Sequence, residues 1–119
     1  AILPLEPTRF SSLKSDLKFL ECAAAGATVL ASPMVYAESI QDGVTGLIFH
    51  NPAEFEARLN ALIERPQLRH SLAKAAYEWV KTYRLQALHF RDRYDWYCDL
   101  LDRLPELNAS LRRRVPEVF

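Results

Sequence analysis

The sequence predicts an α/β domain with a short parallel sheet and a helix-rich C-terminal half. A helical pattern over residues 13–25 runs directly into the apolar, partly β-branched segment 27–32. A second short apolar run, at 47–49, is followed only by helical patterns. A continuous apolar run suits a strand buried on both faces, and a helix that feeds such a strand is typical of an α/β layer. We therefore expect both runs to be strands of one parallel sheet.

The composition fits a single folded domain. The chain has 119 residues, of which half are hydrophobic and a quarter are charged, close to the values of ordinary globular proteins. Fifteen basic residues balance fifteen acidic ones, so the chain lacks the positive excess with which proteins bind nucleic acid. No apolar run reaches the length of a membrane span. We expect a soluble chain with no nucleic-acid partner.

The first elements follow from apolar spacing and from the residues that end each run. Residues 2–5 are apolar but interrupted by Pro4, which predicts the end of a strand that lies at a sheet edge or opens onto a loop. The helix over 13–25 follows two serines, Ser11 and Ser12, either of which can cap it, and a glycine at position 26 ends it. Its apolar positions recur at intervals of four, three and four: Leu13, Leu17, Leu20 and Ala24.

Three helices are expected in the second half. Asn51 caps the first of them, with a proline at the first helical position, and Pro66 likewise stands at the first position of the second helix. The last helix spans about 85–104 and ends at Pro105. Its expected buried positions follow a helical stripe: Leu88, Tyr94, Tyr97, Leu100, Leu101 and Leu104. Residues 105–119 are expected to form a poorly ordered tail.

Neither the cysteines nor the histidines suggest a metal or redox site. Cys22 and Cys98 are far apart and fit small buried hydrophobic residues of a reducing compartment. His50, His70 and His89 lack the spacing of zinc ligands, and the sequence contains no Asp-x-Asp motif. We therefore expect neither a metal ion nor a cofactor.

Polar residues gather at the start of the first predicted helix. Ser12, Lys14 and Ser15 stand where the free N–H groups of a first helical turn and the helix dipole favour an anion such as a phosphate. Lys18 and Glu21 follow on the same flank of the helix as Lys14. Two interpretations of Glu21 remain open: an ordinary ion pair with Lys18 on a solvated face, or a carboxylate that accepts hydrogen bonds from a ribose diol.

Three short motifs stand in a fixed order along the first half of the chain. They are the segments 21–26 (ECAAAG), 27–32 (ATVLAS) and 38–49 (ESIQDGVTGLIF). With the helix pair that follows, this order resembles the C-terminal, donor-binding half of the group 1 glycosyltransferases of the GT-B fold. The resemblance covers about residues 2–104 and implies a partial, Rossmann-like three-layer domain.

The resemblance assigns a role to Glu21 and shows one departure from the family. Glu21 matches the second glutamate of the E-x7-E motif, whose carboxylate holds the ribose of the nucleotide. The first glutamate of that motif contacts the sugar or takes part in catalysis, and Leu13 stands at its position. Either Lys14 and Ser15 replace that glutamate or this part of the function is lost, and no catalytic residue is assigned.

The remaining donor-site residues are also implied by the resemblance. The backbone around Ser12 to Asp16, with Lys14, matches the turn and helix start that cradle the diphosphate of the donor. Glu38 matches a glutamate that precedes the Asp-Gly turn in the family, although it also fits an exposed loop residue. Three further positions are best explained as turn chemistry: Asp42, Gly43 and Gly46.

The resemblance implies a fragment of a retaining glycosyltransferase of polysaccharide biosynthesis. Such an enzyme moves a sugar from a nucleoside-diphosphate sugar to a polysaccharide or glycolipid acceptor, in the cytoplasm or peripherally at the inner face of the membrane. The family's N-terminal acceptor domain is missing, so we expect the fragment alone to be inactive. The alternative is an inactive module that binds a nucleotide sugar or a protein partner. The long last helix also predicts exposed aromatic surface and self-association of the fragment.

Overall fold

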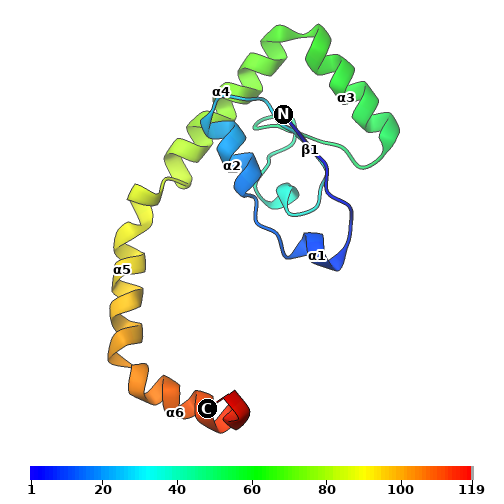
Figure 1. Ribbon diagram of the computed structural model, residues 1–119. Coiled ribbons are helices and arrows are strands. Elements are labelled where there is room, and N and C mark those ends of the chain that lie inside the picture. The colour runs from blue at the N-terminus through cyan, green and yellow to red at the C-terminus, as the bar shows by residue number, and fades with distance from the viewer. Residues whose placement is uncertain (119) are drawn as a thin grey trace. The chain divides into compact units, whose positions relative to one another are not determined.

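A short parallel sheet organises the first part of the chain (Figure 1). The computed structural model describes residues 1–118. Among them, β1 (Ile2–Leu3), β2 (Leu30–Ala31) and β3 (Leu47–Ile48) pair in the order β1-β2-β3, with all strands parallel. The predicted α/β class with a short parallel sheet is therefore confirmed, and it forms part of a Rossmann-like layer. The chain divides into two compact units, residues 1–84 and the residues from 85 onward.

The central strand is buried on both faces, as its apolar sequence predicts. Val29 and Ala31 pack into one cluster with helix α2 (Leu17–Ala24), and Leu30 packs into a second cluster with helix α3 (Pro52–Glu64). Successive side chains of a strand point to opposite faces of the sheet, which accounts for the division. Helix α4 (Pro66–Tyr83) contributes to both clusters. Leu72 of α4 lies in the cluster with Leu30, and Ala76 and Val80, in the last two turns of α4, lie in the cluster with α2.

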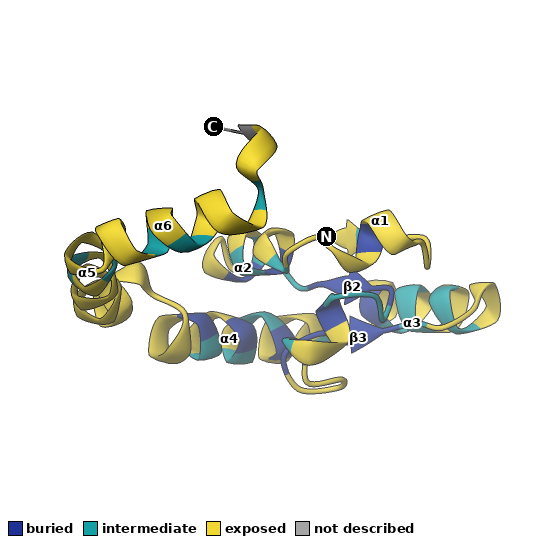
Figure 2. Cartoon of the chain, turned by 90° about the horizontal axis from the view of Figure 1, so that it is seen from below, coloured by how far each residue is buried: buried dark blue, intermediate teal, exposed yellow. Residues whose placement is uncertain are grey.

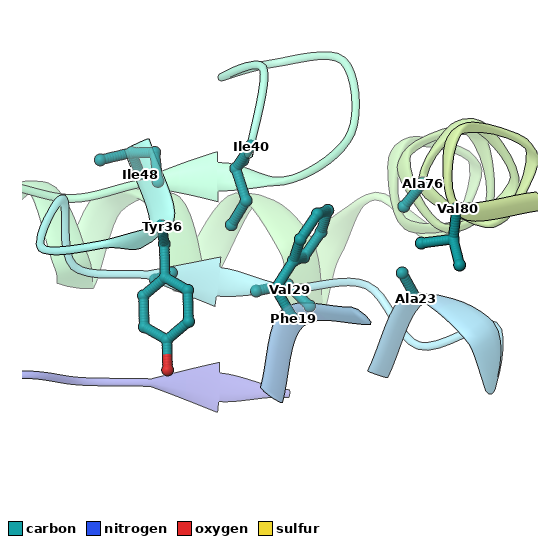
Figure 3. Close-up of a cluster of buried hydrophobic side chains, with 9 residues drawn as sticks. Phe19, Ala23, Val29, Tyr36, Ile40, Ile48, Ala76 and Val80 are labelled. Carbon is teal, nitrogen blue, oxygen red and sulfur yellow. The ribbon is translucent and has the colours of Figure 1, made fainter. Parts of the chain in front are cut away.

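The first cluster joins the two helices α2 and α4. In Figure 3, Ala23 of α2 lies opposite Ala76 and Val80 of α4, where small side chains let the helices approach closely. Phe19 is completely buried in the same cluster, and its ring lies 5.8 Å from the ring of Trp79. This packing holds α2 against α4.

The predicted helix over 13–25 is wrong at its start and in its buried face. A short helix α1 (Arg9–Ser12) is capped by Thr8, whose hydroxyl accepts from the Ser11 N–H, and α2 begins only at Leu17. Leu13 is 80% exposed in the turn between the helices. The buried positions of α2 are Phe19 and Ala23 rather than the predicted stripe, because the face that meets the sheet and α4 decides which residues are covered.

The structure confirms the backbone conformations predicted for glycines at turns. Gly26 has φ of +73°, and the N–H groups of Gly26 and Ala27 donate to the carbonyls of Ala23 and Cys22 in the pattern that closes a helix. Gly43 also lies in the left-handed region, with φ of +77°. At Gly46 a Cβ would lie 3.1 Å from Ile40 Cγ2 and 3.2 Å from the Val29 carbonyl oxygen, so a larger residue would have to push these close neighbours back.

Helix α3 begins as the sequence predicts. The Asn51 side chain accepts a hydrogen bond of 2.9 Å from the Glu54 N–H, with Pro52 in the first turn. The Glu54 carboxylate accepts in turn from the His50 N–H, so free N–H groups at this end are satisfied. Pro66 begins α4 directly after α3. Between β2 and β3 lies only a short 3₁₀ turn, η1 (Tyr36–Glu38).

The second unit consists of α5 (Gln86–Asp102), α6 (Leu104–Arg114) and the 3₁₀ turn η2 (Pro116–Val118). Contrary to the predicted burial, α5 has no buried residue, and Figure 2 shows both helices mostly as exposed surface. Helix α6 occupies much of the segment for which a poorly ordered tail is predicted. Pro105 sits in the first turn of α6, where its missing N–H costs nothing, so it starts a helix as well as ending one. No helix within residues 1–118 combines the length and the apolar character needed to cross a bilayer.

Candidate functional site

Three segments far apart in the sequence surround one pocket of about 530 Å³. They are the turn between α1 and α2, the loop that follows β2, and the C-terminal end of α4. The residues that line it are Ser12, Lys14, Ser15, Asp16, Met34, Val35, Glu38, Ser39 and Arg84. The pocket is polar and carries both signs of charge.

The structure brings four of the five predicted donor-site residues together and leaves one outside. Ser12, Lys14, Ser15 and Glu38 all line the pocket. Glu21 does not: it is exposed on α2, where its Oε2 accepts a hydrogen bond of 2.9 Å from Lys18 Nζ. Of the two interpretations of Glu21, the ion pair is the one that the structure contains.

The backbone of the turn explains how Lys14 and the serines reach the pocket. Helix α1 ends at Ser12, whose hydroxyl donates to the Arg9 carbonyl, and the Leu13 and Lys14 N–H groups donate to carbonyls of α1. Four residues, 13–16, then separate α1 from the start of α2. The Lys14 ammonium lies 5.1 Å from the centroid of the Phe10 ring, so its charge is held near α1 by a cation–π contact.

The loop after β2 forms the opposite wall and contains a strained residue. Val35 has φ of +28°, a region that β-branched residues rarely adopt, and it lines the pocket. A backbone held there costs about 1–3 kcal/mol and persists only where the surroundings impose it. Here the half-buried Val35 side chain packs against the first core cluster, and the loop continues into Glu38 and Ser39 at the pocket.

Asp16 is the most heavily bonded side chain of the pocket. Its two carboxylate oxygens accept hydrogen bonds of 2.8 and 3.0 Å from both terminal nitrogens of Arg84, and Oδ2 accepts a third from the Ser39 hydroxyl. The side chains of Asp16 and Arg84 are 14% and 34% exposed. Burial acts to raise the pKa of Asp16, but the hydrogen bonds from Arg84 and Ser39 outweigh it and hold the pKa below its usual value of 3.8.

The lowered pKa of Asp16 predicts a loss of stability in acid. Because the carboxyl is more acidic in the folded chain than in the unfolded one, its contribution is complete above the unfolded pKa and is lost as the pH falls through the folded pKa. Urea denaturation of the chain should give a free energy of unfolding that decreases below about pH 4. Asp16→Asn should flatten that decrease.

Asp99→Asn is the matched control for this pH dependence. Asp99 pairs with Arg103 on the exposed surface of α5, and exposed ion pairs contribute little to stability. The slope of the free energy of unfolding against pH should therefore be the same in Asp99→Asn and in the wild-type chain. An unchanged slope in Asp16→Asn would show that Asp16 is not the group that titrates.

Sequence reasoning missed Asp16, Ser39 and Arg84. Asp16 and Arg84 are 68 residues apart, and no local pattern marks Arg84, which is the C-terminal cap of α4. Asp42, for which the sequence predicts only a turn, also has a role in packing. Besides standing in a turn, its carboxylate accepts from both terminal nitrogens of Arg58 and from the Ile48 N–H, so it ties β3 to α3. These bonds outweigh the effect of burial and lower its pKa.

A second pocket, of about 440 Å³, lies at the carboxyl end of β1. Its lining residues are Ile2, Leu3, Pro4, Leu5, Lys14, Ser15, Leu17, Lys18 and Tyr36. Lys14 and Ser15 therefore line both pockets, and Lys18, the partner of Glu21, lines the second. Crevices at the carboxyl ends of parallel strands are where α/β sheets bind their ligands. Within residues 1–118, no group of three or more His, Cys, Asp or Glu side chains is arranged to hold a metal ion.

Comparison with known proteins shows the family to which this chain belongs. A family model described as glycosyl transferase-like matches residues 4–89. The chain belongs to the glycosyl transferase-like family. The matched region contains every residue that lines the first pocket, from Ser12 to Arg84. No curated protein matches the chain. Membership of this family indicates a transferase that acts on glycosyl groups.

Proposed function

We propose that the chain is the donor-binding part of a retaining, group 1 glycosyltransferase of the GT-B fold. The enzyme transfers a sugar from a nucleoside-diphosphate sugar to a polysaccharide or glycolipid acceptor, and an N-terminal domain outside this chain binds the acceptor. The observation that supports this proposal most is the convergence of Ser12, Lys14, Ser15 and Glu38 on one pocket inside the family match. A glycolipid acceptor would place the enzyme at the cytoplasmic face of a membrane.

The diphosphate of the donor binds at the turn between α1 and α2. Lys14 supplies positive charge there, and the Ser15 hydroxyl supplies a hydrogen-bond donor. The Ser12 hydroxyl, which donates to the Arg9 carbonyl in the free chain, donates to the diphosphate by exchanging that carbonyl for a phosphate oxygen. Groups placed where negative charge grows on a leaving diphosphate stabilise the transition state more than the bound substrate, and this difference accelerates transfer. Glu38 lies on the opposite wall, where its carboxylate accepts hydrogen bonds from sugar hydroxyls.

Glu21 binds the ribose beside the second pocket. Its present partner, Lys18, lines that pocket, and the Lys18–Glu21 pair is exposed on both sides. Exposed ion pairs are weak, so the carboxylate can exchange the ammonium for the two neighbouring hydroxyls of a ribose. Lys14 and Ser15 line both pockets and join the ribose end of the donor to its diphosphate end.

Glu21→Gln tests this assignment in the full-length enzyme. Because the substitution removes a charged acceptor from two ribose hydroxyls, kcat/KM for the donor should fall about 10- to 150-fold, corresponding to roughly 1.5–3 kcal/mol. Glu56→Gln is the matched control, since Glu56 is exposed on α3 and lines neither pocket. Equal kcat/KM values for Glu21→Gln and the wild-type enzyme would contradict ribose binding by Glu21.

A second candidate function is favoured by Leu13. This residue occupies the position of the first glutamate of the family motif and is exposed in the turn beside the pocket. A leucine there cannot accept a hydrogen bond or a proton. The alternative is therefore a glycosyltransferase-like module that binds a nucleotide sugar or a protein partner without turnover. Slow hydrolysis of the donor by the full-length protein would support the enzyme, and binding without hydrolysis would support the module.

A further inference from the structure

We propose that Arg84 is a second cationic ligand for the diphosphate of the donor, opposite Lys14. The inference rests on the proposed donor site and adds to it a residue from the far end of the family match. Arg84 lines the same pocket as Lys14, Ser12 and Ser15, although it lies at the C-terminal end of α4.

The guanidinium of Arg84 is held in place by Asp16 and Trp79 and keeps hydrogen-bond donors that neither of them uses. It has five N–H groups, of which two are donated to Asp16 in a parallel fork. Its carbon lies 5.5 Å from the centroid of the Trp79 ring, so an aromatic face supports the group. Three N–H groups remain, and the side chain is one-third exposed at the pocket. An arginine fixed in this way binds a phosphate with little further loss of side-chain entropy.

The charges of the residues that line the pocket also favour this role for Arg84. The carboxylates of Asp16 and Glu38 line the pocket with the ammonium of Lys14, so these three side chains alone leave one net negative charge. A diphosphate would be repelled by such a site. Arg84 neutralises Asp16 through short bonds, which leaves Lys14 and the free face of the guanidinium to meet the anion.

A second arginine, Arg58, makes the same two-bond ion pair with an aspartate in a purely structural role. Arg58 donates to both oxygens of Asp42, at 2.6 and 3.0 Å, and thereby holds α3 against the turn before β3. Arg58 is not among the residues that line the pocket. The two arginines therefore share their bonding geometry and differ in access to the pocket, which makes Arg58 the control for Arg84.

The experiment compares Arg84→Gln with Arg58→Gln in the 119-residue chain, with inorganic diphosphate as the probe. Thermal unfolding should show that both variants are less stable, since each loses a forked ion pair. Isothermal titration should show that the Kd for diphosphate rises about tenfold or more in Arg84→Gln alone. The double variant Asp16→Asn/Arg84→Gln keeps an amide pair for folding and leaves the net charge of the pocket unchanged, and it should bind diphosphate as weakly as Arg84→Gln.

Four other outcomes would contradict the role of Arg84 or the donor site itself. Equal diphosphate affinity in Arg84→Gln and the wild-type chain would overturn the role of Arg84 and leave the donor site intact. Equal weakening in Arg84→Gln and Arg58→Gln would assign the effect to lost stability and overturn it as well. Wild-type affinity in the double variant would do the same. A wild-type chain that binds no diphosphate would overturn both the donor site and the role of Arg84.

Discussion

Phe19→Ala is expected to lower the free energy of unfolding of the first unit by about 3–5 kcal/mol. Phe19 is completely buried, and its ring packs against Trp79 and the cluster that joins α2, β2 and α4. Removing the ring leaves a cavity that several elements would have to close together, so little of the loss can be recovered. Urea denaturation of the chain, followed by far-ultraviolet circular dichroism, measures the change.

Leu17→Ala is the matched control for Phe19→Ala. Leu17 lies two residues earlier on the same helix but is about half exposed, so its truncation should cost less than about 1 kcal/mol. Similar losses in the two variants would contradict the packing of α2 on the sheet. The comparison also bears on the pocket, because α2 and α4 carry Asp16 and Arg84 at their adjoining ends.

Helix starts that depend on local chemistry could be predicted from the sequence. Asn51, followed by proline and by a glutamate three positions on, specifies its own hydrogen bonds, and the structure contains them. Gly26 could be predicted for the same reason, since a left-handed residue at a helix end needs no distant partner. Pro105 shows the limit of such reasoning, because a proline that ends one helix can also begin the next.

Which face of a helix is buried could not be predicted from spacing alone. Leu13 and Leu17 have helical spacing, yet Leu13 lies outside α2 and both are exposed. Phe19 and Ala23 are buried instead, because α4 and the sheet happen to meet that side of α2. Amphipathic spacing identifies a helix, whereas the partner surface that selects its face comes from elements much later in the chain.

The candidate site likewise contains residues that the local sequence predicts and one that only tertiary packing brings to the pocket. Ser12, Lys14 and Ser15 are close in sequence, and the order of motifs predicts them in one donor site with Glu38. All four residues line a common pocket, and donor binding there stays a prediction. Arg84 could not be found in this way, since only the packing of α4 against α2 brings it to Asp16. The sequence predicts the ion pair of Glu21 with Lys18 as one of two alternatives, because helical geometry alone places residues three positions apart side by side.

The second prediction of large effect concerns the oligomeric state of the isolated chain. Helix α5 carries an exposed apolar stripe at spacings of four, three and four: Phe90, Tyr94, Tyr97 and Leu101. Four carboxylates recur at spacings of three, four and three and lie on the opposite side of the helix: Asp92, Asp95, Asp99 and Asp102. The stripe is thus a continuous, exposed apolar face of α5.

We expect a second copy of the chain to cover this stripe at high micromolar concentration, because pairing two such faces buries aromatic surface on both helices. Tyr97→Lys places a charge in the middle of the stripe and should shift the chain to monomer. Asp95→Lys changes the net charge of the chain more than Tyr97→Lys does, but on the opposite side of α5. This variant should therefore associate as the wild-type chain does. Sedimentation velocity at several concentrations measures the difference. A wild-type chain that remains monomeric throughout, or equal dissociation in both variants, would show that this face does not drive association.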